Sequence, residues 1–256
     1  MEPHLKHSVM DGVATVVISN AAKRNAMTAR MWRTLPGLLE RFADDPEVRA
    51  LVLTGAGDTF CAGADISSLR ADSGDGRLPD DAPQDLAVRA EDALAAFPKP
   101  TLAAVRGYCV GGGCQLAAAC DLRFAEQGAS FGVTPARLGI VYPASSTRRL
   151  AALVGPSAAK YLLFSAELID TERALRTGLV DEVLPAGQLD KRVAEFTRVL
   201  ASRSQLTQAA AKEFVAGRAD RAPHWAGQAR GSGDTAEGVA AFLERRTPRF
   251  TWTTGG

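Results

Sequence analysis

The sequence has little net charge and no long hydrophobic run. Lys and Arg total 30 against 29 acidic residues, for a formal net charge of +1, so neither nucleic acid nor a membrane surface is expected as a partner. No apolar stretch approaches the roughly 20 residues of a membrane-spanning helix. Residues 1–12 also lack the apolar segment of a secretory signal. These absences predict a cytoplasmic protein.

Metal-binding and disulfide patterns are missing as well. Four cysteines (Cys61, Cys109, Cys114 and Cys120) show no C-x-x-C pairing, and the chain has only 3 histidines. We therefore expect no metal site, and we expect the thiols to be reduced and mostly buried. The 256 residues are 46% apolar, which suits one large domain, or one domain with an appendage, that buries a full core.

Segments rich in β-branched residues dominate the first half of the chain, and helical periodicity dominates the second half. Thr28 is expected to cap the first helix. The Gly- and Pro-rich residues 70–85 are expected to form a mobile loop, and residues 107–113 a turn. The predicted strands are 13–19, 49–54, 101–106, 122–125, 130–133 and 182–184. The predicted helices are 28–43, 86–97, 114–119, 150–154, 157–164, 171–177, 189–200, 205–214 and 235–243.

Two short segments that follow predicted strands contain small residues in the pattern of a ligand-binding loop. The first is residues 60–66 (FCAGADI), where Ala and Gly let a ligand approach the backbone closely. The second is residues 107–115 (GYCVGGGCQ), whose glycine triplet leads into a helix. Free N–H groups at such a helix start lie at the positive end of the helix dipole. They can stabilise an oxyanion or hold a phosphate.

Together these segments resemble the enoyl-CoA hydratase/isomerase (crotonase) family. The family pattern reads roughly F-x-A-G-A-D-[IL] and then A-V-x-G-x-x-x-G-G-G-x-E-L-x-x-x-C-D. Residues 60–66 and 104–121 follow it apart from Gln115, and the resemblance spans residues 13–250. The flanking matches are RNAM at 24–27, GLVDEV at 178–183 and AFLERRTP at 241–248.

The resemblance implies an α/β fold, the ClpP-like crotonase spiral of repeated ββα turns with two nearly perpendicular sheets. Residues 1–199 would form the spiral core with an acyl-CoA site, and residues 200–256 a helical trimerisation region. The expected assembly is a homotrimer or a dimer of trimers. The expected partner is an acyl-CoA thioester, so coenzyme A enters as part of the substrate and no tightly bound cofactor is expected.

The resemblance also implies the residues of the site. The backbone N–H groups of Ala64 and Gly112 would form an oxyanion hole that binds the thioester oxygen and stabilises it as an enolate. The phosphates of coenzyme A would be contacted by Lys23 or Arg24, and by Arg245 or Arg246 of a neighbouring subunit. The alternative for these four side chains is a solvated position on the surface. The residues expected to contact coenzyme A are Lys23, Arg24, Ala62, Ala64, Asp65, Ile66 and Arg245.

Two positions depart from the family pattern. Hydratases of the family carry glutamates where this chain has Gln115 and, aligned without a gap, Pro135. Hydration needs a base that activates water and an acid that delivers a proton. An amide does not titrate near neutral pH, and proline has neither a side-chain donor nor an acceptor. The sequence therefore predicts weak or absent hydration of crotonyl-CoA.

Three functions remain open on this reading. The first is an enzyme acting on an enoyl- or related acyl-CoA with a rearranged acid–base set. The second is a decarboxylase of a malonyl- or methylmalonyl-type CoA, because residues 134–142 (TPARLGIVY) resemble the T-P-A-x-L-G-x-x-Y stretch of that branch. The third is a non-catalytic acyl-CoA binder. Tyr142 is the predicted proton donor or substrate-orienting group in the acyl pocket; its alternative is a packing role.

Overall fold

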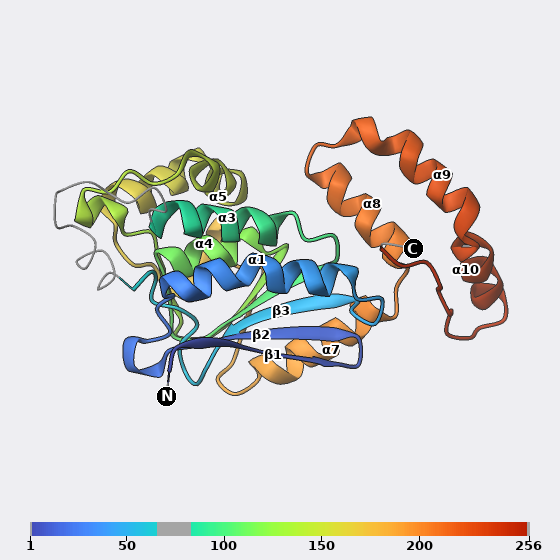
Figure 1. Cartoon of the computed structure of the whole chain (residues 1–256), viewed down its shortest axis with the longest axis horizontal. Coiled ribbons are helices and arrows are strands. Elements are labelled where there is room, and N and C mark those ends of the chain that lie inside the picture. Colours follow the sequence, from blue (N-terminus) through green and yellow to red (C-terminus); the bar gives the residue numbers. More distant parts are fainter. Residues whose placement is uncertain (1, 66–82, 255–256) are drawn as a thin grey trace.

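A largely parallel sheet runs through the centre of the molecule (Figure 1). The computed structural model describes residues 2–65 and 83–254. Within them, six strands pair in the order β1-β2-β3-β4-β6-β8. Only the β1–β2 pair is antiparallel among these described strands. The strands are β1 (His4–Met10), β2 (Val13–Ser19), β3 (Ala50–Gly55), β4 (Thr101–Val105), β6 (Leu122–Glu126) and β8 (Glu182–Leu184).

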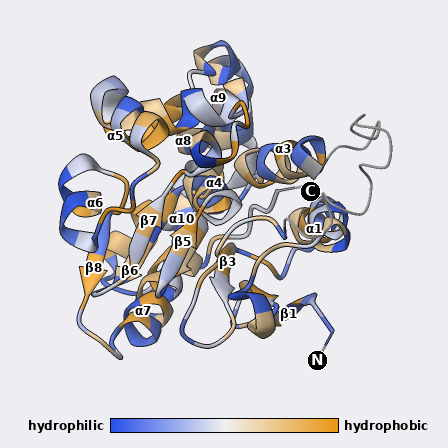
Figure 2. Ribbon diagram, turned by 90° about the vertical axis from the view of Figure 1, so that its left-hand side faces the viewer, coloured by the Kyte–Doolittle hydropathy of each residue, from blue (hydrophilic) through white to orange (hydrophobic). Residues whose placement is uncertain are grey.

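Helices cover both faces of this sheet. In Figure 1, α1 (Ala29–Asp44), α3 (Pro83–Ala95) and α4 (Gly112–Ala119) lie on one face, and α7 (Leu189–Ala201) lies on the other. Every residue of β4 is buried, as a parallel strand covered on both sides requires. Figure 2 shows the strands as mostly hydrophobic, while the surrounding helices alternate between hydrophobic and hydrophilic turns.

The first helix begins and packs as its sequence predicts. The Thr28 side chain accepts a hydrogen bond from the backbone N–H of Met31, which caps α1. The buried residues of α1 recur every three or four positions, so one face of the helix packs on the sheet. They are Met31, Trp32, Leu35, Leu38, Leu39 and Phe42.

A second, two-stranded sheet corrects the prediction of a plain turn at residues 107–113. Here β5 (Tyr108–Val110) pairs in parallel with β7 (Ser130–Gly132). The backbone N–H of Gly111 then donates to the carbonyl of Gly132 at 2.8 Å. The three residues of β5 carry too little periodicity to be distinguished from a turn, because glycines flank them on both sides. This pairing fixes the start of α4 beside β7.

The predicted mobile loop at residues 70–85 lies mostly outside the described residues. Its last three residues open α3, so the helix begins at Pro83 rather than at Leu86. Proline is favoured in the first turn of a helix, where its missing N–H removes no hydrogen bond.

The segment after β7 contains the predicted helices. α5 (Ala144–Ser165) is broken at Gly155, whose φ is 76°. The predicted break between helices 150–154 and 157–164 is therefore confirmed, but the first of the two begins earlier than predicted, at Ala144. A 3-10 helix, η2 (Pro135–Leu138), precedes α5, and α6 (Thr171–Thr177) follows it.

The last helices form a separate lobe, at the right of Figure 1. It comprises α8 (Gln205–Val215), α9 (Ala222–Ser232) and α10 (Asp234–Leu243). No residue of α9 is buried, and several large apolar side chains of the lobe are exposed, among them Val215 (91%) and Phe242 (82%).

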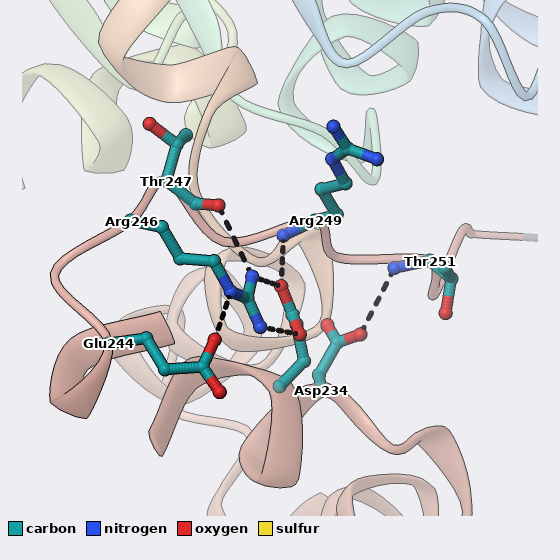
Figure 3. A network of polar contacts seen from close by, with 7 residues as sticks. Asp234, Glu244, Arg246, Thr247, Arg249 and Thr251 are labelled. Atoms are coloured by element: carbon teal, nitrogen blue, oxygen red, sulfur yellow. Dashed lines mark hydrogen bonds and ion pairs between the residues drawn. The ribbon is translucent and has the colours of Figure 1, made fainter. Parts of the chain in front are cut away.

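Polar contacts hold the C-terminal segment against α10 (Figure 3). The Arg246 guanidinium pairs with Glu237 at 2.6 Å and with Glu244 at 2.6 Å. Glu237 also accepts from the Arg249 backbone N–H at 2.6 Å. The hydrogen bond from Arg246, together with that from Arg249, lowers the pKa of Glu237 to about 2. These contacts tie the segment after α10 back to that helix.

Candidate active site

The two small-residue segments predicted from the sequence lie side by side. The Cys61 N–H donates to the Tyr108 carbonyl at 2.8 Å, and the Val110 N–H donates back to the Cys61 carbonyl at 3.0 Å. A methyl group built on Gly63 would lie 3.6 Å from the backbone N of Gly112. One built on Gly112 would lie 3.5 Å from the backbone N of Ala64. The two predicted oxyanion donors are thus neighbours, although their positions are 48 apart in the sequence.

Neither backbone donor has a hydrogen-bond partner in the described part of the chain. Residues on either side of Ala64 are tied to Met27, whose N–H donates to Gly63 and whose carbonyl accepts from Asp65, each at 2.8 Å. The Ala64 N–H itself makes no hydrogen bond to the described part of the chain. Gly112 opens α4, so its N–H has no partner within the helix. This pair of N–H groups is the predicted oxyanion hole, and we keep that name for it below.

Close packing explains why glycine is needed around the oxyanion hole. A methyl group on Gly113 would lie 2.2 Å from the Cys61 carbonyl oxygen, which is far inside van der Waals contact. Gly63 and Gly111 have φ angles of 112° and 54°, in the region that glycine adopts without strain. The glycines therefore let the two segments approach and turn their N–H groups outward.

Trp32 forms one wall of the oxyanion hole, and sequence reasoning missed it. Its ring would lie 3.0 Å from a methyl group on Gly112. The side chain is buried, and its Nε1 is a buried donor without a partner among the described residues. In the sequence Trp32 is one of several apolar residues on the face of an amphipathic helix, so no local pattern distinguishes it from core.

Gln115 is buried one turn further along α4, in a polar network that joins three helices. Its Nε2 donates to Glu91 Oε2 at 2.6 Å and to Ser146 Oγ at 3.1 Å. The Ser146 hydroxyl also donates to Glu91 Oε2. Arg149 forms an ion pair with Glu91 Oε1 and contacts Asp92 Oδ1 at 3.2 Å. We call Gln115, Glu91, Ser146 and Arg149 the Gln115 network.

Sequence reasoning missed Glu91, although a local signal marks it. Glu91 is 0% exposed. It lies in the buried stripe of α3 formed by Leu86, Ala87, Ala90 and Leu94. A carboxylate in an apolar stripe must be paired, because burying an unpaired charge is costly. The sequence can reveal such an anomaly, but it cannot identify the partners on α4 and α5.

Pro135 lies close to the glycine-rich turn, on the segment that leaves β7. A methyl group on Gly111 would lie 3.6 Å from the hydroxyl of Thr134, the residue before Pro135. Pro135 opens η2 and is partly buried. A pyrrolidine ring in this position brings no proton donor or acceptor to the site.

Tyr142 is partly buried and packs against the main hydrophobic core. Burial raises the pKa of its hydroxyl well above 10, the nearby Cys114 and Glu91 raise it further, and Arg149 opposes this rise. These influences place the phenol within electrostatic range of the Gln115 network. The hydroxyl makes no hydrogen bond within the described part of the chain, so it remains able to donate.

The predicted coenzyme A contacts fall into two groups. Lys23 pairs with Asp65 at 2.7 Å, and Arg24 lies 4.9 Å from the centre of the Tyr108 ring. The Ala62 N–H donates to the Arg24 carbonyl at 3.0 Å. The first group therefore consists of neighbouring residues, namely Lys23, Arg24, Ala62 and Asp65. Ile66 lies outside the described residues.

Arg245 belongs to the second group, at a distance from the first. It follows α10 in the C-terminal lobe. Figure 1 shows α10 at the end of the molecule opposite to the start of α1, near which Lys23 and Arg24 lie. A single chain therefore does not bring Arg245 to the same coenzyme A contact as Lys23.

The four cysteines are free and buried, as expected. Burial raises the pKa of Cys61 and of Cys120 to about 12 in each case, which leaves these thiols protonated and unreactive near neutral pH. The described residues contain no group of three or more His, Cys, Asp or Glu placed to hold a metal ion. No helix in the described ranges is long and apolar enough to cross a membrane.

The fold and the paired loops agree with comparisons to known proteins. The enoyl-CoA hydratase/isomerase family model matches residues 8–253, so the chain belongs to this family. It is 35% identical to crotonyl-CoA hydratase of Syntrophomonas wolfei, over 93% of this chain and 94% of that protein. It is 34% identical to 2,3-dehydroadipyl-CoA hydratase of Escherichia coli, with the same coverage.

Solved structures confirm the predicted fold class. An enoyl-CoA hydratase/isomerase family member superimposes with a TM-score of 0.91 at 39% identity, covering 99% of this chain and 98% of that one. Enoyl-CoA hydratase from Bacillus anthracis gives a TM-score of 0.87 at 28% identity, covering 98% and 99%. The chain therefore has the crotonase fold with helices at its C-terminal end.

Proposed function

We propose that this protein is an acyl-CoA enzyme that stabilises the enolate of a bound thioester in the oxyanion hole. The observation that carries the proposal is the pair of free N–H groups of Ala64 and Gly112, brought together by two loops from distant parts of the chain. Hydratases on CoA thioesters among the relatives support the substrate class.

The oxyanion hole acts on the charge that develops during the reaction. When the α-carbon of a thioester loses a substituent as a cation or as carbon dioxide, negative charge moves to the thioester oxygen. Two preorganised N–H donors stabilise that charge more than the neutral carbonyl, which lowers the barrier. The start of α4 adds the positive end of a helix dipole.

The reaction differs from two-glutamate hydration in this proposal. Gln115 and Pro135 stand where hydratases of the family carry their acid and base, and neither residue transfers a proton near neutral pH. Tyr142 is the candidate that remains for a proton donor, because its raised pKa keeps the hydroxyl protonated. Such a group suits protonation of an enolate better than activation of water.

Decarboxylation of a malonyl- or methylmalonyl-type thioester is the second candidate. Loss of carbon dioxide generates the enolate without a base, and the oxyanion hole with a phenol donor then suffices. The hydroxyl of Tyr142 is partly buried and has no hydrogen-bond partner among the described residues. This favours decarboxylation over a non-catalytic binder, which has no need of a proton donor beside the acyl group.

Calorimetry with two matched ligands tests the core of the proposal. Butyryl-CoA carries the thioester oxygen, whereas the thioether S-butyl-CoA has the same chain without it. We expect butyryl-CoA to bind more tightly, by about threefold to tenfold for a net hydrogen-bond contribution. Equal binding would remove the oxyanion hole, and turnover of enoyl-, malonyl- and methylmalonyl-CoA then separates the candidate reactions.

We also propose that residues 200–256 pack between copies of the chain, in a homotrimer or a dimer of trimers. The exposed apolar side chains of the C-terminal lobe, Phe242 and Leu243 among them, favour burial against another subunit. Arg245 of a neighbouring copy would then join Lys23 and Arg24 at the phosphates of coenzyme A. Light scattering of wild type and Phe242→Glu tests this, since a monomeric wild type would contradict it.

A further inference from the structure

The chain that leads into α1 is joined to the Ala64 half of the oxyanion hole. Met27 forms a parallel β-bridge with Ala64. The Met27 N–H donates to the Gly63 carbonyl, and the Met27 carbonyl accepts from the Asp65 N–H, each at 2.8 Å. Because backbone hydrogen bonds flank Ala64 on both sides, its position is fixed relative to the start of the helix.

The first turn of α1 meets the Gly112 half of the oxyanion hole through Trp32. The Trp32 N–H donates to the carbonyl of the capping residue Thr28 at 3.0 Å, so Trp32 belongs to the helix from its first turn. A methyl group built on Gly112 would lie 3.0 Å from Cζ2 and 3.3 Å from Cη2 of the indole. The same methyl group would lie 3.5 Å from the backbone N of Ala64. The indole therefore fills the side of Gly112 on which the two donors meet.

Packing alone holds this indole in place. Trp32 is 1% exposed, and its Nε1 is a buried donor without a hydrogen-bond partner among the described residues. Leaving such a donor unpaired in the interior is unfavourable, so the indole N–H does not account for tryptophan at this position. The size of the ring does, because Cζ2 and Cη2 lie at the far end of the indole, beyond the reach of a phenylalanine ring.

Other segments confine the residues on either side of Gly112. The Gly111 N–H donates to the Gly132 carbonyl at 2.8 Å. Gly113 lies so close to Cys61 that an added methyl group would be 2.2 Å from the Cys61 carbonyl oxygen. Gly112 itself has no side chain with which to pack. The indole supplies the contact that Gly112 lacks on the side of α1.

We propose that Trp32 is a positioning residue that sets the separation of the two oxyanion donors, acting through Gly112. Residues 27–32 span the distance between the donors, since Met27 is bonded to the Ala64 loop and the Trp32 ring packs beside Gly112. One helical turn and one planar ring form a spacer that packing locks in place. The inference rests on the proposed function, because two donors stabilise one thioester oxygen only when both are aimed at it in advance.

Calorimetry with butyryl-CoA and S-butyl-CoA tests this role, because only butyryl-CoA has a thioester oxygen. We expect wild type to prefer butyryl-CoA by about threefold to tenfold. Trp32→Phe should lose most of this preference and keep its affinity for S-butyl-CoA, since it opens a gap beside Gly112 and adds no polar group. Phe42→Leu is the matched control. Phe42 is a buried aromatic residue in the last turn of the same helix, so this variant should keep the wild-type preference.

A methyl group on Gly112 offers a rescue of the Trp32→Phe variant. In wild type the added carbon of Gly112→Ala lies 3.0 Å from the indole, whereas in Trp32→Phe it points into the gap that the shorter ring leaves. The double variant should therefore recover part of the lost preference for butyryl-CoA. Circular dichroism checks that each variant folds. If Trp32→Phe does not fold, Trp32→Met takes its place with the same expected loss, because methionine is long but not rigid.

The outcomes separate this inference from the proposed function. Equal binding of the two ligands to wild type removes the oxyanion hole, and the proposed function fails with it. A wild-type preference that Trp32→Phe retains overturns the role of Trp32 and leaves the oxyanion hole intact. An equal loss of preference in Phe42→Leu also overturns that role, because general loosening of α1 then explains the effect. A double variant no better than Trp32→Phe overturns the action through Gly112.

Discussion

The oxyanion hole and the Gln115 network lie one helical turn apart, yet they relate to the family in different ways. The oxyanion hole is made of backbone N–H groups, so its chemistry depends on conformation and on glycines that permit close approach. The Gln115 network is made of side chains, and we propose that its amide takes the place of a family glutamate. Backbone chemistry is preserved wherever the fold is preserved, whereas side-chain chemistry changes with a single residue.

The largest expected effect concerns hydration of crotonyl-CoA by the wild-type protein. General acid–base catalysis contributes about 10²–10⁴-fold per group, and in the proposed alignment Gln115 and Pro135 supply neither group. We expect kcat well below the roughly 10 s⁻¹ of an ordinary enzyme in a steady-state absorbance assay. A kcat at that level would show that Gln115 and Pro135 do not stand at the acid and base positions.

Gly112→Pro addresses the backbone half of the comparison. It removes one oxyanion donor, which should lower turnover of any substrate found by about 10²–10³-fold, or on the order of 3 kcal/mol. Proline is tolerated in the first turn of a helix, and Gly112 opens α4.

Gly112→Ala is the matched control for that variant. It adds the same Cβ, 3.0 Å from the Trp32 ring, but keeps the N–H. If alanine and proline reduce turnover equally in single-turnover kinetics, the effect comes from crowding against Trp32 and the donor contributes nothing.

Tyr142→Phe addresses the side-chain half. If the hydroxyl protonates the enolate, kcat should fall by about 10²-fold, at the lower end for a general acid. Because burial raises the pKa of Tyr142 above 10, the ratio of wild-type to variant rates should stay constant from about pH 6 to about pH 9. An unchanged rate would leave Tyr142 with a packing role.

Gly113→Ala should lower the free energy of unfolding. Its methyl group would lie 2.2 Å from the Cys61 carbonyl oxygen, so the two loops must separate, at a cost of about 1–3 kcal/mol. Gly37→Ala is the control, because nothing lies within 4 Å of its added methyl group. Urea unfolding should show a loss for Gly113→Ala alone.

Local patterns predicted much of the fold. The strand at Val13–Ser19 and the capped helix at Ala29–Asp44 follow from a β-branched run and from Thr28 before an apolar stripe. Besides β5, two longer elements were missed, each for its own reason. β1 (HLKHSVM) is a polar strand with little burial, and α9 contains Pro and Gly residues that weaken helix propensity.

The candidate site was predictable where it depends on sequence motifs and not where it depends on tertiary contacts. Ala64 and Gly112 fall within motifs, and the structure brings them together as expected. Glu91 and Trp32 contact the site from other helices, and their local sequence does not identify those contacts. Arg245 shows that a motif alone does not place a residue at the site. The motif that contains it lies in the C-terminal lobe, remote from the other predicted coenzyme A contacts of the same chain.

Infrared difference spectroscopy of bound butyryl-CoA, labelled with carbon-13 at the thioester carbonyl, tests the central claim most directly. It reports polarisation of the carbonyl whatever reaction follows. We predict that the carbonyl stretch moves to lower wavenumber on binding to wild type and to Gly112→Ala, and moves less on binding to Gly112→Pro. A bound carbonyl that absorbs at the frequency of free butyryl-CoA would contradict the oxyanion hole.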